Sequence, residues 1–236
     1  MRAVILAGGK GRRLAPYTTI LPKPLMPIGD IPILEIVIRQ LKRDGFDHIT
    51  MAVGYLAGLL MAYFNTGERY DVHIDYSQER EPLGTAGPLS LITDLDETFL
   101  LMNGDVLTNL DYKALVAYHK AHGCIATIAA HRRAVKIDLG VLQMDRDGAL
   151  TEYVEKPPID YLASMGIYVF EPEILNHIPG GKYLDLPNLV QNLLKKGRRV
   201  QCYAFNGYWL DIGRHDDYER AVEKFEQNPS EFLPEE

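Results

Sequence analysis

The chain has 236 residues, of which 47% are hydrophobic and 24% charged, as in an ordinary globular protein with a sizeable core. Its formal net charge of −7 argues against nucleic acid or an anionic membrane surface as a partner, because both normally bind a basic face. No apolar run approaches the roughly 20 residues of a membrane span, and the start does not resemble a signal peptide, so we expect a cytoplasmic protein.

Segments typical of strands and helices alternate along the first half, which is the pattern of a parallel sheet covered by helices. The apolar run 3–6 predicts a buried strand over residues 2–6, and a glycine-rich turn follows it. After a loop with four prolines, apolar residues at helical spacing predict a helix from 33 to 44. The next predicted elements are strand 48–53, helix 55–64, strand 72–76, helix 86–92 and strand 99–102.

The second half begins near residue 111 and contains a predicted hairpin, with strands 139–144 and 149–154 around the turn 145–148. The other predicted elements are helix 112–122, strand 125–130, strand 162–170, helix 186–196 with Asp185 as its N-cap, strands 200–205 and 208–210, and helix 217–225.

Three further expectations concern loops, thiols and the extent of the domain. We expect an exposed loop at residues 131–133 and a mobile acidic tail at residues 229–236. Cys124 and Cys202 are too few and too far apart for a disulfide framework or a zinc cluster, so buried, reduced thiols are favoured. The length lies between that of one large domain and that of two small ones, and no repeat or linker divides the chain; the family resemblance given below implies a single domain over residues 1–228.

The turn at residues 8–11, Gly-Gly-Lys-Gly, directly follows the first strand. Its three glycines allow positive φ and bring backbone N–H groups close to a ligand, which suits phosphate oxygens. The turn is not a P-loop, because Arg12 follows Gly11, and it lacks the third glycine of a dinucleotide fingerprint, because Leu14 stands there. We interpret it as a polyphosphate loop; an ordinary tight turn is the alternative.

Charged residues at three later points suit the same ligand. Lys23 stands between two prolines that stiffen its backbone. Asp105 follows the apolar strand 99–102, and Asp211 follows the strand 208–210; their carboxylates suit Mg²⁺, a hard cation usually held by one or two carboxylates plus substrate phosphates. The alternatives are a solvated lysine and two aspartates that only form turns.

Glu155, Lys156 and Pro157 close the second hairpin strand. A lysine offers a point charge to a phosphate, and a glutamate accepts hydrogen bonds from sugar hydroxyls, so the pair can hold a sugar phosphate at both ends. A surface ion pair is the alternative.

Together these motifs resemble the sugar-1-phosphate nucleotidylyltransferases, the pyrophosphorylases that make nucleotide sugars. They are closest to mannose-1-phosphate guanylyltransferase-like proteins without the C-terminal β-helix domain, and the absence of that domain here makes control through it unexpected. The matching segments stand in family order: residues 6–9 with 11, 13 and 14, then 23–24, 81–87, 103–105, 155–157 and 209–213.

The resemblance implies a Rossmann-like, mixed, mostly parallel sheet flanked by helices, the nucleotidyltransferase or glycosyltransferase-A-like fold. Residues 1–110 would form the nucleotide-binding half and residues 111–228 the sugar-phosphate half. By resemblance the catalytic residues are Arg13, Lys23, Asp105 and Asp211, the last two holding Mg²⁺. The nucleotide-binding residues are Leu6, Ala7, Gly8, Gly9, Gly11, Glu79, Gly84 and Asn103. The sugar-phosphate residues are Gly140, Glu155, Lys156 and Gly166.

The choice of base depends on the loop before Gly84, which reads the base edge in this family. Glu79 lies five residues before Gly84, where thymidylyl and uridylyl members often carry Gln. A carboxylate only accepts hydrogen bonds, so it matches the adjacent N1–H and N2–H₂ donors of guanine. We therefore favour GTP; dTTP, UTP or CTP is the alternative, because a shift by one residue would place Gln78 at the base.

Other functions remain open at this point. Related enzymes act on heptose phosphates or on non-sugar phosphates. A catalytically silent nucleotide-sugar-binding subunit is the alternative from another class, although it could have lost the metal carboxylates that are present here. A dehydrogenase would bind NAD. The sequence leaves the sugar, the pathway and the formation of a homo-oligomer open.

Overall fold

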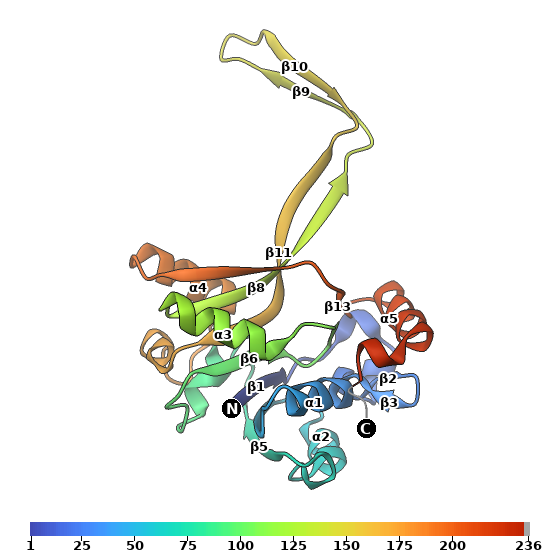
Figure 1. The fold of residues 1–236 in the computed structure, drawn as a ribbon, viewed down its shortest axis with the longest axis vertical. Helices are drawn as coiled ribbons and strands as arrows, with labels where there is room; N and C mark the ends of the chain where they lie inside the picture. The colour runs from blue at the N-terminus through green and yellow to red at the C-terminus, as the bar shows by residue number, and fades with distance from the viewer. Residues whose placement is uncertain (234–236) are drawn as a thin grey trace.

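A computed structural model of the chain describes residues 1–233 and contains a central sheet of seven strands in the order β5-β4-β1-β6-β11-β8-β12 (Figure 1). The strands are β1 (Arg2–Ala7), β4 (His48–Val53), β5 (His73–Gln78), β6 (Phe99–Asn103), β8 (Ala126–Lys136), β11 (Pro158–Phe170) and β12 (Val200–Phe205). Neighbours pair in parallel except β11, which runs antiparallel to both β6 and β8. The predicted mixed, mostly parallel sheet is confirmed.

Helices cover both faces of this sheet because the residues of each central strand point alternately to opposite sides. Ala3 and Ile5 of β1 pack with α1 (Ile33–Arg43), α2 (Ala57–Phe64) and α3 (Tyr112–His122). Val4 packs on the other face with α4 (Leu186–Lys195). None of the helices in residues 1–233 is long and apolar enough to cross a membrane.

A third core lies beside the sheet and involves the end of the described chain. It joins α5 (His215–Gln227) to the short strand pairs β2 (Pro27–Ile28) with β3 (Ile31–Pro32) and β7 (Val106–Thr108) with β13 (Trp209–Asp211). Phe232 is fully buried in this core, and its carbonyl accepts a hydrogen bond of 2.9 Å from Gln40 Nε2. Phe232 and Leu233 thus pack against this core although they lie in the segment for which a mobile tail is predicted; residues 234–236 lie outside the described residues.

Three local predictions are wrong. Residues 87–91 form the short 3₁₀ helix η5 (Gly87–Leu91) in place of the predicted helix 86–92, and the carbonyl of Leu184 accepts hydrogen bonds from the N–H groups of Ala86 and Gly87 at its start. Asp185 does stand at the predicted N-cap of α4, and its side chain makes no capping hydrogen bond. Cys202 is exposed because it lies on the edge strand β12, whereas Cys124 is buried as expected. Residues 131–133 belong to β8 and not to a loop.

The outer parts of β8 and β11 leave the sheet together and stand clear of the body (Figure 1). Beyond them the hairpin of β9 (Gly140–Met144) and β10 (Leu150–Glu155) bends to one side, still clear of the body (Figure 1). We call residues 132–163 the arm. No residue from 131 to 164 is buried, so the arm has no core of its own.

Replacement of the fully buried Phe232 should test whether residues 229–233 support the third core. We expect Phe232→Ala to lower the free energy of unfolding by about 3–5 kcal/mol, because it leaves a cavity beside Phe225. Urea denaturation at neutral pH measures the change. Leu194→Ala, at a side chain that is 57% exposed, is the control and should stay within about 0.5 kcal/mol of the wild type. If the two variants were equally stable, this would contradict the packing of Phe232 in the third core.

Candidate active site

A cleft of about 880 Å³ opens at the carboxyl ends of β1, β4 and β6. Ligands of open α/β sheets bind at this edge, beyond the carboxyl ends of the strands. Of the predicted nucleotide-site residues and cations, ten line it: Leu6, Ala7, Gly8, Gly9, Gly11, Arg13, Lys23, Glu79, Gly84 and Asn103. Asp105 lines it as well. Residues far apart in the sequence therefore meet on one side of the sheet.

The glycine loop is shaped by close contacts at two of its glycines. Gly11 has φ +59°, and a Cβ there would lie 2.9 Å from Cγ2 of Thr18. A Cβ on Gly8 would lie 2.8 Å from Oε1 of Glu79. By contrast, nothing lies within 4 Å of a Cβ on Gly9, so that glycine leaves open space in the cleft. The loop is tightly packed behind Gly8 and Gly11 and open in front of Gly9.

The predicted catalytic cations and carboxylates come together at this edge. Lys23 is 8% exposed, and its ammonium forms an ion pair with Oδ2 of Asp105. Strand β13 pairs with β7, which places Asp211 opposite Val106 and next to Asp105. A Cβ on Gly213 would lie 3.4 Å from both terminal nitrogens of Arg13, so the segment after β13 packs on this guanidinium.

The electrostatics of Asp105 and Asp211 fit a divalent cation. Asp211 is exposed as a whole residue, but its carboxylate is partly buried, and this burial raises its pKa. The negative charge of Asp105 raises the pKa further, whereas the positive charges of Lys23 and Arg13 lower it. Oδ1 of Asp105 is buried and has no hydrogen-bond partner. Two adjacent carboxylates, one with a free buried oxygen, suit a hard cation that prefers oxygen ligands.

The wall of the cleft opposite Lys23 and Asp105 is positioned by contacts between segments that lie far apart in the sequence. Glu79 lies against Gly8 and Gly54, and its Oε2 accepts a hydrogen bond of 3.0 Å from the Leu83 N–H. Asp185 accepts from the Thr85 N–H at 3.2 Å, and Tyr183 also lines the cleft. Sequence reasoning did not include Tyr183 or Asp185 in the site; the only signal was Asp185 before a helix, and it indicated a cap.

The four predicted sugar-phosphate residues are divided between the cleft and the arm. Gly166 adjoins the cleft, because a Cβ there would lie 2.5 Å from Nδ2 of Asn103. Gly140, Glu155 and Lys156 lie on the arm, and none of them lines the cleft. Nζ of Lys156 lies 4.0 Å from Oε1 of Glu155, and the side chains of Glu155 and Lys156 are 58% and 54% exposed. The cleft thus contains the predicted nucleotide-binding residues but not Gly140, Glu155 and Lys156.

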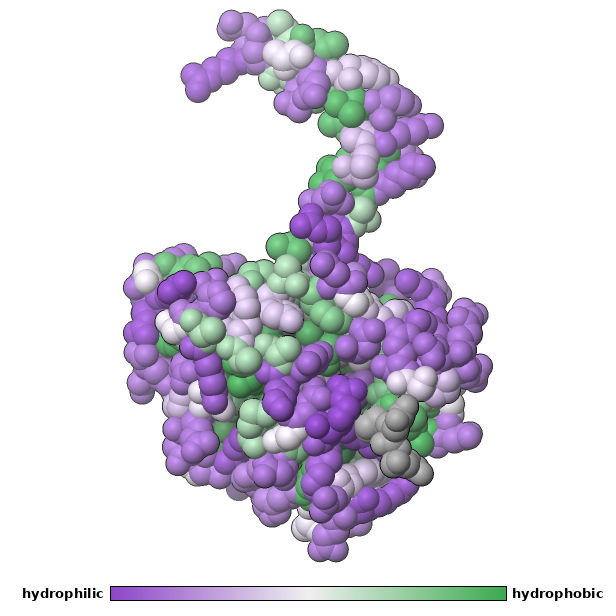
Figure 2. All heavy atoms as spheres, viewed as in Figure 1, coloured by the Kyte–Doolittle hydropathy of each residue, from purple (hydrophilic) through white to green (hydrophobic). Residues whose placement is uncertain are grey.

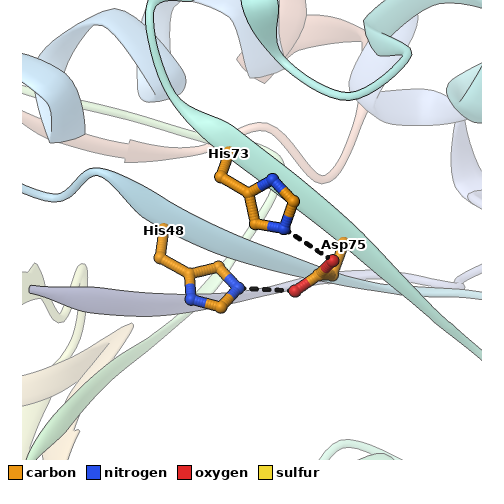
Figure 3. Close-up of side chains that lie close together, drawn as sticks. All are labelled: His48, His73 and Asp75. Carbon is orange, nitrogen blue, oxygen red and sulfur yellow. Dashed lines mark hydrogen bonds and ion pairs between the residues drawn. The ribbon is translucent and has the colours of Figure 1, made fainter.

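A second group of candidate metal ligands lies elsewhere, at the amino ends of β4 and β5 (Figure 3). His48 Nε2 lies 2.5 Å and His73 Nε2 3.0 Å from the two carboxylate oxygens of Asp75. Burial raises the pKa of Asp75, but the hydrogen bond to His48 and the charges of both histidines outweigh it, so the pKa is lowered. Since both oxygens are engaged, hydrogen bonding between β4 and the edge strand β5 accounts for this cluster.

The fold and the cleft define an α/β protein that places its ligands at the carboxyl ends of a mixed sheet. The chain belongs to the nucleotidyl transferase family, whose model matches residues 2–228. This confirms the family predicted from the motifs, that of sugar-1-phosphate nucleotidyltransferases.

Two of the curated relatives are named for different nucleotides, UTP in one case and a guanine nucleotide in the other. The chain is 36% identical to a UTP–glucose-1-phosphate uridylyltransferase of Synechocystis sp., over 94% of this chain and 62% of that protein. It is 33% identical to a mannose-1-phosphate guanyltransferase of Candida albicans, over 92% of this chain and again 62% of that protein. The chain therefore spans less than two thirds of the length of these two relatives.

Two solved structures share the fold over almost the whole chain. A Bacillus anthracis protein described as a glucose-1-phosphate thymidylyltransferase, in complex with a sucrose, matches with a TM-score of 0.77 and 25% identity, over 95% of this chain and 94% of that one. HddC from Yersinia pseudotuberculosis, complexed with GMP-PN, matches with a TM-score of 0.70 and 27% identity, over 95% and 99%. These neighbours confirm the predicted fold class.

Removal of the Asp211 charge should stabilise the free protein at neutral pH. The pKa of Asp211 is raised in the folded state, so the native protein binds a proton at this carboxylate more readily than the unfolded chain does. The contribution of Asp211 to stability is therefore largest below the unfolded pKa of about 3.9 and falls as the pH rises from there to the folded pKa. We expect Asp211→Asn to raise the unfolding temperature at pH 7, with the gain disappearing below about pH 4.

Thermal unfolding of wild type and variant at pH 7 and pH 4, without added metal, measures this effect. Asp96→Asn makes the same chemical change at an exposed loop position and should shift neither temperature. A destabilised Asp211→Asn variant at pH 7 would contradict the electrostatic origin of the raised pKa.

Proposed function

We propose that the protein transfers the nucleotidyl group of a nucleoside triphosphate to a sugar 1-phosphate and releases pyrophosphate. The observation that carries this proposal is the meeting of Arg13 and Lys23 with Asp105 and Asp211 beside the glycine loop. The cations match the negative charge of a triphosphate, and the carboxylates match the divalent ion that accompanies it. The family and the relatives support the same reaction.

The residues in the cleft suggest how the reaction proceeds. An oxygen of the sugar phosphate attacks the α-phosphorus, and the bond to the pyrophosphate oxygen breaks. The attacking oxygen is already anionic at neutral pH, so no general base is required, and catalysis depends on positioning and charge stabilisation. Arg13 and the amides of the glycine loop are assigned to the triphosphate, Gly166 and Asn103 to the junction between the two substrates.

Asp105 and Asp211 are the proposed ligands of Mg²⁺, which when bound would neutralise charge on the phosphates. Lys23 holds Asp105 in the free protein. The Lys23 side chain also lines the cleft, where its ammonium could approach a phosphate oxygen. We assign Lys23 to the phosphate that lies between the two substrates.

We favour GTP as the nucleotide because Glu79 is placed in the cleft with a carboxylate that can only accept hydrogen bonds. One of its oxygens already accepts from the Leu83 N–H, which fixes the side chain. UTP or dTTP is the second candidate, favoured by the uridylyltransferase relative and the Bacillus neighbour. A silent nucleotide-sugar-binding subunit is less well supported, because it would not need the pair Asp105 and Asp211.

A panel of substrates tests the function. The protein with Mg²⁺ is incubated with each of GTP, UTP, dTTP, CTP and ATP and with mannose, glucose and heptose 1-phosphates, and pyrophosphate release is measured. We expect the highest turnover with GTP. Turnover with dTTP or UTP but not GTP would remove the guanine assignment, and no release with any pair would contradict the enzyme.

The phosphate-binding assignment predicts a large loss of turnover. Arg13→Ala should lower kcat at least about 100-fold, because it removes a fixed positive charge from the developing negative charge. Steady-state kinetics at saturating triphosphate measure this. Arg220→Ala, an exposed arginine on α5, is the matched control and should leave kcat unchanged. Near-normal turnover of Arg13→Ala would exclude Arg13 from the chemistry.

The base assignment makes a separate prediction at Glu79. Glu79→Gln supplies an amide N–H₂ that can donate to a carbonyl of uracil or thymine. We expect the ratio of kcat/KM for GTP to that for UTP to fall by about 10-fold or more, as for a change of one polar contact. An unchanged ratio in the same kinetic assay would show that Glu79 does not contact the base.

A further inference from the structure

The arm carries many exposed apolar side chains, interspersed with polar ones (Figure 2). Of the eighteen large hydrophobic side chains that are exposed in the described residues, ten lie on the arm: Val135, Leu139, Leu142, Met144, Leu150, Tyr153, Val154, Ile159, Tyr161 and Leu162. Met144 is 76% and Leu139 73% exposed. So many exposed apolar side chains on one projecting element point to an interaction surface, because single exposed apolar residues are normal but their accumulation is not.

The arm also carries the residues that the cleft of its own chain lacks. Ten residues of extended chain separate Lys156 from Gly166, which adjoins the cleft. At about 3.3 Å per residue, this places Lys156 roughly 30 Å from the cleft. Glu155 and Gly140 pair with each other across the hairpin and lie at the same remote position.

Closure of the arm onto its own cleft is opposed by backbone pairing. Residues 132–136 pair with residues 158–162 in an unbroken antiparallel register, and the pairing of β11 shifts only between Ser164 and Tyr168. This pairing keeps the two strands of the arm extended side by side, and the ladder leads away from the body (Figure 1). Bringing Lys156 back to its own cleft would require breaking several of these main-chain hydrogen bonds.

Exposed apolar side chains also lie on the body. Tyr183 lines the cleft and is 63% exposed. Tyr17 and Ile20 are 56% and 79% exposed and lie on the loop that joins the cleft residues Arg13 and Lys23. These side chains and those of the arm would lose exposed apolar surface if the arm of a second copy packed on this side of the body.

We propose that two copies of this chain exchange arms, so that each arm brings Gly140, Glu155 and Lys156 to the cleft of the other copy. The two contacts are identical, as in an isologous dimer with two-fold symmetry. Each sugar-phosphate site then combines Gly166 and Asn103 of one copy with the arm of the second. The proposal rests on the proposed function for the role of these residues, but the dimer and its contacts can be tested without activity.

Complementation between two defective chains tests the exchange of arms. One chain carries Asp105→Asn and an intact arm; the other carries an intact cleft with Glu155→Ala and Lys156→Ala. The two chains are co-expressed with different tags, and the mixed dimer is isolated through both tags. If arms are exchanged, one of its two sites combines the intact cleft with the intact arm, so we expect about half of the wild-type turnover.

If each arm serves its own chain, both sites of the mixed dimer stay defective. Turnover of the mixed dimer no higher than that of the two parental variants would therefore overturn the proposal. A wild type that is monomeric by analytical ultracentrifugation at assay concentration, yet fully active, would overturn it as well.

Cross-linking separates failure of this inference from failure of the proposed function. Dimers are formed from isotopically light and heavy chains and treated with an amine-reactive cross-linker. We expect cross-links between Lys156 of one copy and Lys10 of the other, visible as peptide pairs of mixed isotope, because Lys10 lines the cleft. Only pairs of a single isotope would overturn the exchange, whether or not pyrophosphate is released.

The apolar surface of the arm gives the last test. Leu142 and Tyr153 face each other across the hairpin and are 60% and 61% exposed. Leu142→Asp together with Tyr153→Asp should produce monomers in ultracentrifugation with an unchanged unfolding temperature of the body, because neither side chain is part of a core. Leu194→Asp, at a similarly exposed position on α4, is the control and should leave the dimer intact. A doubly substituted chain that remains dimeric would overturn the proposal.

Discussion

The site depends on the pairing of β7 with β13, which places two acidic residues side by side. Asp105 immediately precedes β7 and Asp211 ends β13, and the antiparallel register puts them at the same end of this small ladder. Two neighbouring carboxylates repel each other, and Lys23 compensates by pairing with Asp105. The short ladder is fixed in turn by the third core, in which Leu107 and Leu210 pack with α5.

Much of this arrangement could be predicted because parallel strands bring their carboxyl ends to one edge. The glycine loop after β1 and Asn103 at the end of β6 had to lie together once these strands were neighbours, and they both line the cleft. The order of motifs identified the family, which fixes the topology that periodicity alone leaves open. Buried strands such as β6 were recognisable from continuous apolar runs.

The remainder could not be predicted, because it depends on distances that strand patterns do not encode. Residues 131–133, His-Arg-Arg, show no alternation of apolar and polar residues, so the sequence does not reveal that β8 continues beyond the sheet and pairs there with residues 161–163. Phe232 lies in a polar, proline-containing segment, yet it is buried because α5 turns the chain back onto the third core. Tyr183 reaches the cleft only through the contact of residues 184–186 with residues 83–86, about 100 positions earlier.

The structure separates the residues that we propose for the two substrates. The residues proposed for the triphosphate stand on a packed sheet edge, where Gly8 and Gly11 have no room for a side chain and Lys23 is almost fully buried. Three of the four residues proposed for the sugar phosphate, Gly140, Glu155 and Lys156, stand on a two-stranded ladder without a core, so their position is set by what the arm contacts. Since packed elements hold side chains more accurately than elements without a core, the proposed function assigns the chemistry to the sheet edge. It assigns selection of the sugar to the arm, where substitutions cost the body little stability.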